Sequence, residues 1–404
     1  MSLVTSTELV PAQPDVRPEE KPRRGRFHPL FWPGLLFSIA STSITIGILW
    51  DISWHISIGR DTFWTPAHMA IYLGGAMAGF VGGWLAFWNT FFASEAKRAT
   101  CVNVLGARAP LGAWVTIWGA LAMLTSAPFD DWWHNAYGLD VKIISPPHVV
   151  LGLGMFGISV GALLLALAHQ NRALDRAGDA LFIYMGGIFV TLGAVFVMEF
   201  TAPNRQHAAT FYQVCALTFA FRLVALGVAG RITWPATRAA AVYLAFGCLA
   251  TWILPLFPAQ PKLAPIYTPI THMVPPAFPL LLIVPAFGID LFVKKSPPIA
   301  GVWRHILSAI ALGAIFFVTF LAAQWFFSIF LLTSQADNWF FAGNRYWGYN
   351  SRPGIWANKF WELERGAPGA NPITLGSFLW TWVIASMGSW VGVIWGNWMK
   401  KVQR

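Results

Sequence analysis

Charged residues and cysteine are both scarce in this chain. Charged residues make up 11% of the 404 positions and hydrophobic residues 56%, whereas a soluble domain carries about 25% charged residues. The three cysteines, Cys101, Cys215 and Cys248, lie far apart and form no C-x-x-C pair. The composition therefore indicates an integral membrane protein. The cysteine spacing disfavours a disulfide scaffold, a thiolate zinc site and a c-type haem.

Several familiar motifs are also missing. The sequence contains no P-loop, no nucleophile elbow and no H-E-x-x-H, which gives no support to nucleotide binding, to α/β-hydrolase chemistry or to a metalloprotease. The net charge of +10 comes from 27 Lys and Arg against 17 Asp and Glu. In a membrane protein such an excess belongs to cytoplasmic loops, so we expect no nucleic acid partner.

Long apolar runs are what the sequence does contain. A run of roughly 20 apolar residues can cross a bilayer as a helix. We therefore predict an all-α, polytopic membrane helix bundle with about ten transmembrane helices. The runs lie near 31–55, 66–92, 110–134, 147–169, 179–200, 209–229, 236–256, 272–293, 303–333 and 374–398.

Basic residues predict the orientation of these runs. Clusters of Lys and Arg precede the first run, follow the last one, and recur in connections that all fall on one side, so both termini are expected to be cytoplasmic. We divide the chain into a disordered cytoplasmic tail at 1–30, a helical hairpin pair at 31–170 and further membrane helices at 171–404. The last part includes an outer aromatic loop at 334–373. The tail is too long and too charged for a cleaved signal sequence.

The first hairpin carries a carboxylate and two imidazoles. Asp51 and His55 are four residues apart and therefore share one face of a helix. Pro66 suits the first position of the returning helix, because the N–H that proline lacks would have no helical partner there. His68 then lies in the opening turn of that helix, beside Asp51 and His55. All three side chains are expected at the outer face of the membrane.

The second hairpin repeats this pattern. Asp130 and His134 are again four apart, and His148 follows a proline pair fourteen residues after His134, where the first copy has a gap of thirteen. Two copies of such a three-residue pattern are stronger evidence than one. Glycine rows at 75–83 and 157–161 predict that the helices of these hairpins pack closely.

These side chains favour metal binding. Carboxylates and imidazoles at membrane depth are costly unless they are paired or bind a ligand, so they indicate function. Two His and one Asp suit a divalent first-row metal, and copper, zinc and iron all fit by ligand type. Three protein ligands leave positions open for water, oxygen or substrate. The alternative is that buried His–Asp hydrogen bonds only pin each hairpin together.

The first hairpin resembles the C subunit of the particulate methane and ammonia monooxygenases, the copper membrane monooxygenases. The resemblance covers residues of about 31–165, and nothing after about residue 180 is recognisable. In that family a carboxylate and two histidines at this spacing form one copper site, and an Asn with two histidines forms a second. The matching stretch is Asp51-x3-His55-x4-Arg60-Asp61-Thr62-x2-Thr65-Pro66-x-His68.

The resemblance implies copper at two sites, with zinc and iron as alternatives. Asp51, His55 and His68 would form the first and catalytic site, and Asp130, His134 and His148 the second. Asp130 replaces the Asn of the family, and an anionic ligand favours a harder or more oxidised metal.

The implied activity is a copper-dependent membrane monooxygenase that oxidises a small apolar substrate with dioxygen. The protein would lie in a bacterial inner membrane with its metal sites toward the periplasm, as a homotrimer or with other monooxygenase-type subunits. A metal or proton transporter and a structural subunit of a larger membrane complex remain alternatives. The ten runs and the prolines of the run at 272–293 favour the transporter, while the lack of a matching hairpin pair in the second half disfavours it.

Overall fold

The computed structural model describes residues 28–59, 62–138, 145–173, 175–262, 270–296, 301–342, 358–361 and 371–403. Most of the predicted tail at 1–30, much of the predicted aromatic loop at 334–373, and Arg60 and Asp61 lie outside these residues. The described residues confirm an all-α membrane bundle. Nine of their segments are long and apolar enough to span a membrane: α1 (Phe31–Ser57), α2 (Pro66–Phe91), α4 (Leu111–Tyr137), α5 (Pro146–Ala173), α6 (Arg176–Phe196), α7 to α8 (Ala209–Ala229), α9 with η4 (Pro235–Leu256), α11 (Val302–Leu331) and α13 (Leu375–Met399).

Shorter elements connect or subdivide these spans. A π-helical turn, η3, divides the sixth span, and two short strands pair antiparallel after α2, with Val102 opposite Ala109. The remaining bounds are α3 (Glu95–Ala99), β1 (Val102–Val104), β2 (Ala107–Ala109), η1 (Met198–Phe200), η2 (Pro203–Arg205), α7 (Ala209–Cys215), η3 (Ala216–Ala220), α8 (Phe221–Ala229), α9 (Pro235–Ile253), η4 (Leu254–Leu256) and α10 (Ile283–Lys295).

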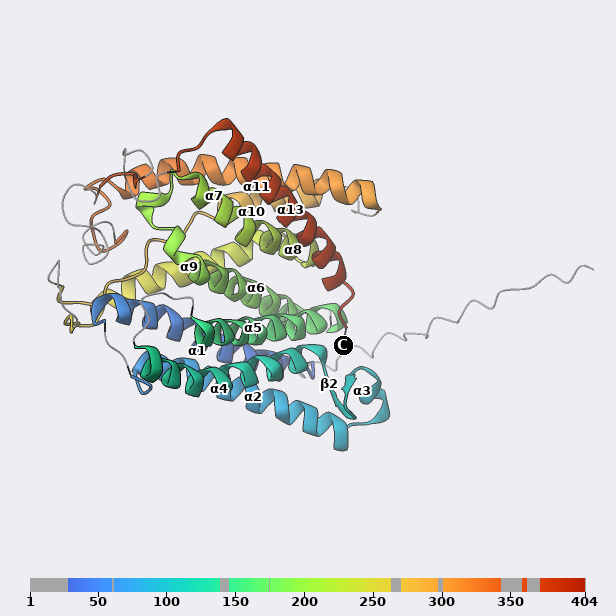
Figure 1. The fold of residues 1–404 in the computed structure, drawn as a ribbon. Coiled ribbons are helices and arrows are strands. Elements are labelled where there is room, and N and C mark those ends of the chain that lie inside the picture. Colours follow the sequence, from blue (N-terminus) through green and yellow to red (C-terminus); the bar gives the residue numbers. More distant parts are fainter. Residues whose placement is uncertain are drawn as a thin grey trace, which may run out of the picture.

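The hairpin pair, the middle helices and the last helices occupy successive parts of the bundle, and α13 also packs against α8 (Figure 1). The hairpins α1–α2 and α4–α5 form one side of the bundle, α6, α8 and α9 form the middle, and α11 with α13 forms the other side. The largest cluster of buried apolar side chains lies mainly in the middle helices. Helices α1 and α4 end, and α2 and α5 begin, at the same end of the bundle (left in Figure 1). The helices of the second half therefore pack directly onto the hairpin pair.

Glycines allow the helices of the second hairpin to touch. A Cβ atom added at Gly154 of α5 would lie 2.8 Å from the backbone oxygen of Gly119 in α4, and one added at Gly161 would lie 2.5 Å from that of Gly112. Such short distances leave no room for any side chain. Of the rows predicted from the sequence, 157–161 serves this packing, whereas Gly75 and Gly79 of α2 face α4 of the other hairpin and Gly83 has nothing within 4 Å.

The run at 272–293 differs from the prediction. The helix α10 covers only Ile283–Lys295, and residues 273–281 before it form no helix although most of them are buried. Three prolines in this stretch, Pro275, Pro276 and Pro279, explain the difference, because proline removes a helical hydrogen bond and disfavours helix in the residue before it. The predicted eighth run is therefore part non-helical chain and part helix.

Side chains of neighbouring helices satisfy this extended backbone. The N–H of Val274 donates to Ser57 Oγ at 2.7 Å, and the N–H of Leu280 donates to the hydroxyl of Tyr243 at 2.9 Å. The N–H of Leu281 donates to Oε1 of Gln324 at 2.9 Å. Irregular backbone at membrane depth is tolerated only where protein groups satisfy it. The stretch is thus bound to α1, α9 and α11 at once.

We expect Gln324→Leu to destabilise the protein. Gln324 is fully buried, and its amide nitrogen also donates to Oε1 of Gln206 at 2.7 Å, so the substitution leaves that buried oxygen and the half-buried N–H of Leu281 without this partner. Each such loss costs about 1–3 kcal/mol. Thermal unfolding in detergent measures the effect, with Gln335→Leu as the control because Gln335 is exposed. Equal stability of the two variants would show that the hydrogen bonds of Gln324 do not stabilise residues 273–281.

Candidate metal centres

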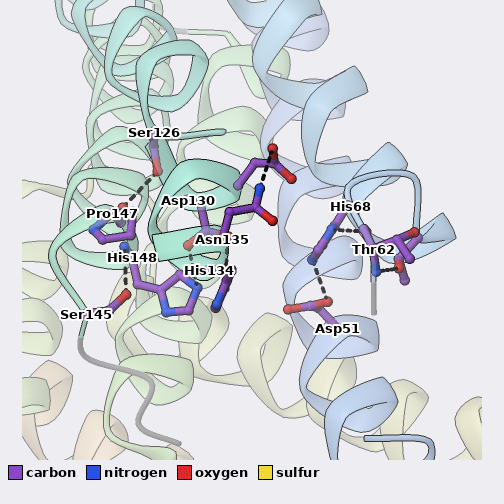
Figure 2. Close-up of polar contacts among 12 residues, drawn as sticks. Asp51, Thr62, His68, Ser126, Asp130, His134, Asn135, Ser145, Pro147 and His148 are labelled. Carbon is purple, nitrogen blue, oxygen red and sulfur yellow. Dashed lines mark hydrogen bonds and ion pairs between the residues drawn. The ribbon is translucent and has the colours of Figure 1, made fainter. Parts of the chain in front are cut away.

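The first site joins the end of α1 to the start of α2 (Figure 2). Oδ1 of Asp51 lies 3.1 Å from Nε2 of His68. Oδ2 of Asp51 lies 3.7 Å from Nε2 of His55. One donor atom from each of the three residues lies within 4.8 Å of the others. Side-chain exposure is 14% for Asp51, 17% for His68 and 49% for His55, so the site opens on the side of His55.

The turn before α2 sets the direction of the His68 ring. Pro66 begins the helix as predicted, which makes His68 its third residue. The N–H of Thr62 donates to Thr65 Oγ1 at 2.8 Å, and the N–H of Thr65 donates to the carbonyl of Thr62 at 2.9 Å, which closes the turn. The same Thr62 carbonyl lies 3.0 Å from Nδ1 of His68. A carbonyl only accepts, so Nδ1 carries the hydrogen and Nε2 of a neutral ring presents its lone pair to Asp51.

The second site repeats this arrangement between α4 and α5. Oδ1 of Asp130 lies 3.3 Å from Nε2 of His148, and Oδ2 lies 3.5 Å from Nε2 of His134. The three donor atoms again lie within 4.8 Å of one another. All three side chains are 24–30% exposed. Because α5 begins at Pro146, His148 is the third residue of its helix, as His68 is of α2.

In the second site the oriented imidazole is the one on the first helix. Nδ1 of His134 lies 3.2 Å from the carbonyl of Gly138. Gly138 ends α4 with a φ of +87°, a conformation that glycine adopts without strain. Nδ1 therefore carries a hydrogen, and Nε2 of a neutral His134 ring points its lone pair at Asp130. Each site thus contains one imidazole whose tautomer is fixed by a backbone carbonyl.

The atoms around Asp51 suit a bound cation. Oδ1 of Asp51 is buried and receives no hydrogen bond in the described part of the chain, although His68 Nε2 lies only 3.1 Å away. When the His68 ring is neutral and its hydrogen is on Nδ1, two lone pairs face each other across this gap. A cation placed between them removes the repulsion and uses both atoms. The cation that fits here is either a metal ion or the second proton of a charged His68 ring, which would pair directly with Asp51.

Sequence reasoning missed the contacts that hold the end of α1. The hydroxyl of Ser53 donates to the carbonyl of Val274 at 2.7 Å, and the N–H of Val274 donates to Ser57 Oγ. The N–H of Lys262 donates to the carbonyl of Ile58 at 2.9 Å. The only signal in the sequence was that Ser53 and Ser57 are four apart and so share a helix face. Through Ser53 and Ser57, the second half of the chain holds the last turns of α1, which carry Asp51 and His55.

No family model, curated protein or solved structure matches this chain. The structure brings the six residues predicted as ligands together in the two predicted groups of three, Asp51, His55 and His68, and Asp130, His134 and His148. Among the described residues, His272 joins neither group, and its Nδ1 lies 2.9 Å from the hydroxyl of Thr271. The nature of the metal and the resemblance to the monooxygenases remain predictions.

Proposed function

We propose that the protein is a copper-dependent membrane monooxygenase that oxidises a small apolar substrate with dioxygen at the site of Asp51, His55 and His68. The observation that supports this proposal most is the repeated group of one carboxylate and two imidazoles at the same end of an apolar bundle. Copper bound there supplies the one-electron chemistry with dioxygen that no side chain of this protein offers. One oxygen atom enters the substrate and the other leaves as water, with electrons and protons from an external reductant.

The side chains of the first site have distinct roles in this proposal. Asp51 supplies the anionic oxygen and compensates part of the positive charge of the metal. His55 and His68 supply neutral nitrogen ligands, and Thr62 keeps the His68 ring in place. The substrate and dioxygen both dissolve in the bilayer and reach the open side of the site near His55. We place the sites at the periplasmic face of a bacterial inner membrane, in a homotrimer or beside other monooxygenase-type subunits.

A metal or proton transporter is the second candidate. The observation that favours it is the buried, non-helical stretch at 273–281, because transporters bind their cargo at broken helices. Its prolines and apolar residues, however, bring no charged group to that stretch. Metal or proton flux in proteoliposomes that His148→Ala abolishes would support the transporter. Tightly bound metal in a fixed ratio without flux would support the enzyme.

Elemental analysis of the purified protein tests the proposal first. We expect about two copper ions per wild-type chain and about one in each of His55→Ala and His134→Ala, because each hairpin holds its own ion. His272→Ala is the matched control and should keep both ions. A folded protein without copper after purification in lipid would refute the enzyme and favour a transporter or a structural subunit of a larger complex.

A further inference from the structure

A small cavity of about 50 Å³ lies beside the non-helical stretch at 273–281. Residues 276–280 form one of its walls. The other walls come from three helices and the turn after α6, and they include Leu49 of α1, Thr191 of α6, Met198 of η1 and Tyr243 of α9. Leu49 lies two residues before Asp51, so their side chains leave α1 on nearly opposite faces. The cavity is therefore separate from the first metal site.

The size and the lack of charge restrict the occupant of this cavity. One water needs roughly 10–15 Å³ of such volume, so the cavity has room for about three water-sized groups. A lipid, a nucleotide or an organic cofactor is too large. None of the described residues that line the cavity is charged, and an ion buried without a compensating charge is strongly unfavourable. The occupant is therefore small and neutral.

The side chain of Tyr243 brings a hydrogen-bond donor to the cavity. Tyr243 is 4% exposed, and its hydroxyl oxygen accepts the N–H of Leu280 at 2.9 Å. Because Leu280 also lines the cavity, the hydroxyl lies at the cavity wall. This is the one hydrogen bond of the Tyr243 side chain within the described chain, so its hydroxyl hydrogen has no protein acceptor there. A buried donor without an acceptor is unfavourable, which favours an occupant that accepts a hydrogen bond.

Two threonines in the lining provide acceptors. The hydroxyl of Thr191 donates to the carbonyl of Gly187 at 2.8 Å, and the hydroxyl of Thr201 donates to the carbonyl of Met198 at 3.1 Å. Each hydroxyl oxygen keeps lone pairs that accept a further hydrogen bond. The lining thus offers one donor and two acceptors. A hydroxyl group, which both donates and accepts, is complementary to this set.

Apolar side chains complete the lining. Leu49 and Phe278 are buried, and Met198 lies beside them in the lining. Such side chains favour contact with carbon atoms over contact with water. A molecule that carries both a hydroxyl group and a short carbon chain therefore matches the lining better than water does.

We propose that this cavity binds a short-chain alcohol of about three non-hydrogen atoms, such as ethanol. Tyr243 donates to the hydroxyl oxygen of the alcohol, and Thr191 or Thr201 accepts its hydrogen. Water carries the same hydroxyl chemistry, but the apolar side chains favour the alcohol. An alcohol is also the product class of the oxidation of a small apolar substrate. Only this last link rests on the proposed function, since binding in the cavity requires no metal.

The methyl group of Met198 gives a direct readout of occupancy. The full-length protein is labelled with ¹³C at its methionine methyl groups and studied by NMR in detergent micelles. The signal of Met198 is the one that Met198→Leu removes. We expect this signal to shift and saturate as ethanol is added, and to stay unchanged with propane, which has the same number of heavy atoms and no hydroxyl. Met399, which does not line the cavity, reports any general effect of ethanol on the micelle.

Variants of the lining test the hydrogen bonds. We expect Tyr243→Phe and Thr191→Val each to weaken ethanol binding about fivefold, the effect of one neutral hydrogen bond. Tyr243→Phe also leaves the N–H of Leu280 without its acceptor, whereas Thr191→Val removes only a bond within α6. Tyr184→Phe is the matched control, because it removes a phenol hydroxyl that does not line the cavity. Thermal unfolding identifies any variant that has lost its fold, and in that case Thr191→Val carries the test.

Each outcome has a defined meaning. A saturable shift with ethanol that both lining variants weaken and Tyr184→Phe does not supports the alcohol site. An equal response to propane overturns it, because the cavity is then an apolar void. A Met198 shift no larger than that of Met399 also overturns it and indicates a cavity that holds water only. These results are independent of metal content, so the alcohol site and the proposed oxidation can fail separately.

Discussion

The Asp51→Ala protein is expected to lose the metal of the first hairpin and its oxidation activity together. Asp51 is the anionic member of the site and the one residue that lies close to both imidazoles, at 3.1 and 3.7 Å. Loss of a residue that only orients a metal ligand lowers affinity or activity about 10–100-fold. Loss of the carboxylate itself should therefore exceed about a hundredfold in both. Metal content and oxygen-dependent turnover of a small apolar substrate are the measurements.

Variants of the second hairpin provide the controls. Asp130→Ala should remove the metal of the second hairpin and leave that of the first. Asp131→Ala should remove neither, because Asp131 lies outside both groups and contacts Asn135 at 3.3 Å. If Asp51→Ala loses its metal but keeps its activity, the catalytic role of the first site is wrong. If it keeps the metal, Asp51 is not a ligand.

Gly154→Leu is expected to destabilise the protein and to disturb the second site. A Cβ atom at this position would lie 2.6 Å from Met123 Cγ and 2.8 Å from the carbonyl oxygen of Gly119, so α4 and α5 must move apart. Overpacking of this kind costs about 1–3 kcal/mol. The movement also separates Asp130 on α4 from His148 on α5, which should release the second metal and leave the first. Thermal unfolding and metal content per chain measure the two effects.

Gly83→Leu is the matched control. Gly83 lies on α2, and nothing surrounds the place of its Cβ atom within 4 Å. This variant should unfold at the wild-type temperature and keep all its metal. Similar losses in both variants would mean that leucine disturbs the helices themselves. A stable Gly154→Leu protein would mean that α4 and α5 are less closely packed than described.

Much of the fold follows from the sequence because lipid imposes a simple rule. Each span must satisfy its own backbone hydrogen bonds as a helix, so apolar length alone predicts it. This rule holds for the nine apolar spans of the described chain. It fails at 273–281, where the backbone is satisfied by Ser57, Tyr243 and Gln324 from other helices. Such partners are distant in sequence, so composition and periodicity do not reveal them.

The candidate sites were predictable because their residues lie at the ends of predicted helices. A spacing of four places Asp51 and His55 on one face, and a proline at the first helical position fixes the place of the next histidine. The orienting carbonyls of Thr62 and Gly138 were not predictable, because any residue type provides a carbonyl and only the fold decides which one is near. The support from Val274 was missed for the same reason.

The extended stretch at 273–281 has a consequence for the order in which the chain enters the membrane. One of its partners, Gln324, belongs to α11 and is synthesised about forty residues later. Until α11 arrives, the N–H of Leu281 has no protein acceptor, and in hydrocarbon an unsatisfied group costs several kcal/mol. We therefore expect this stretch to stay in contact with water or with the translocation machinery until α11 is synthesised. We expect residues 273–295 and α11 to enter the bilayer together.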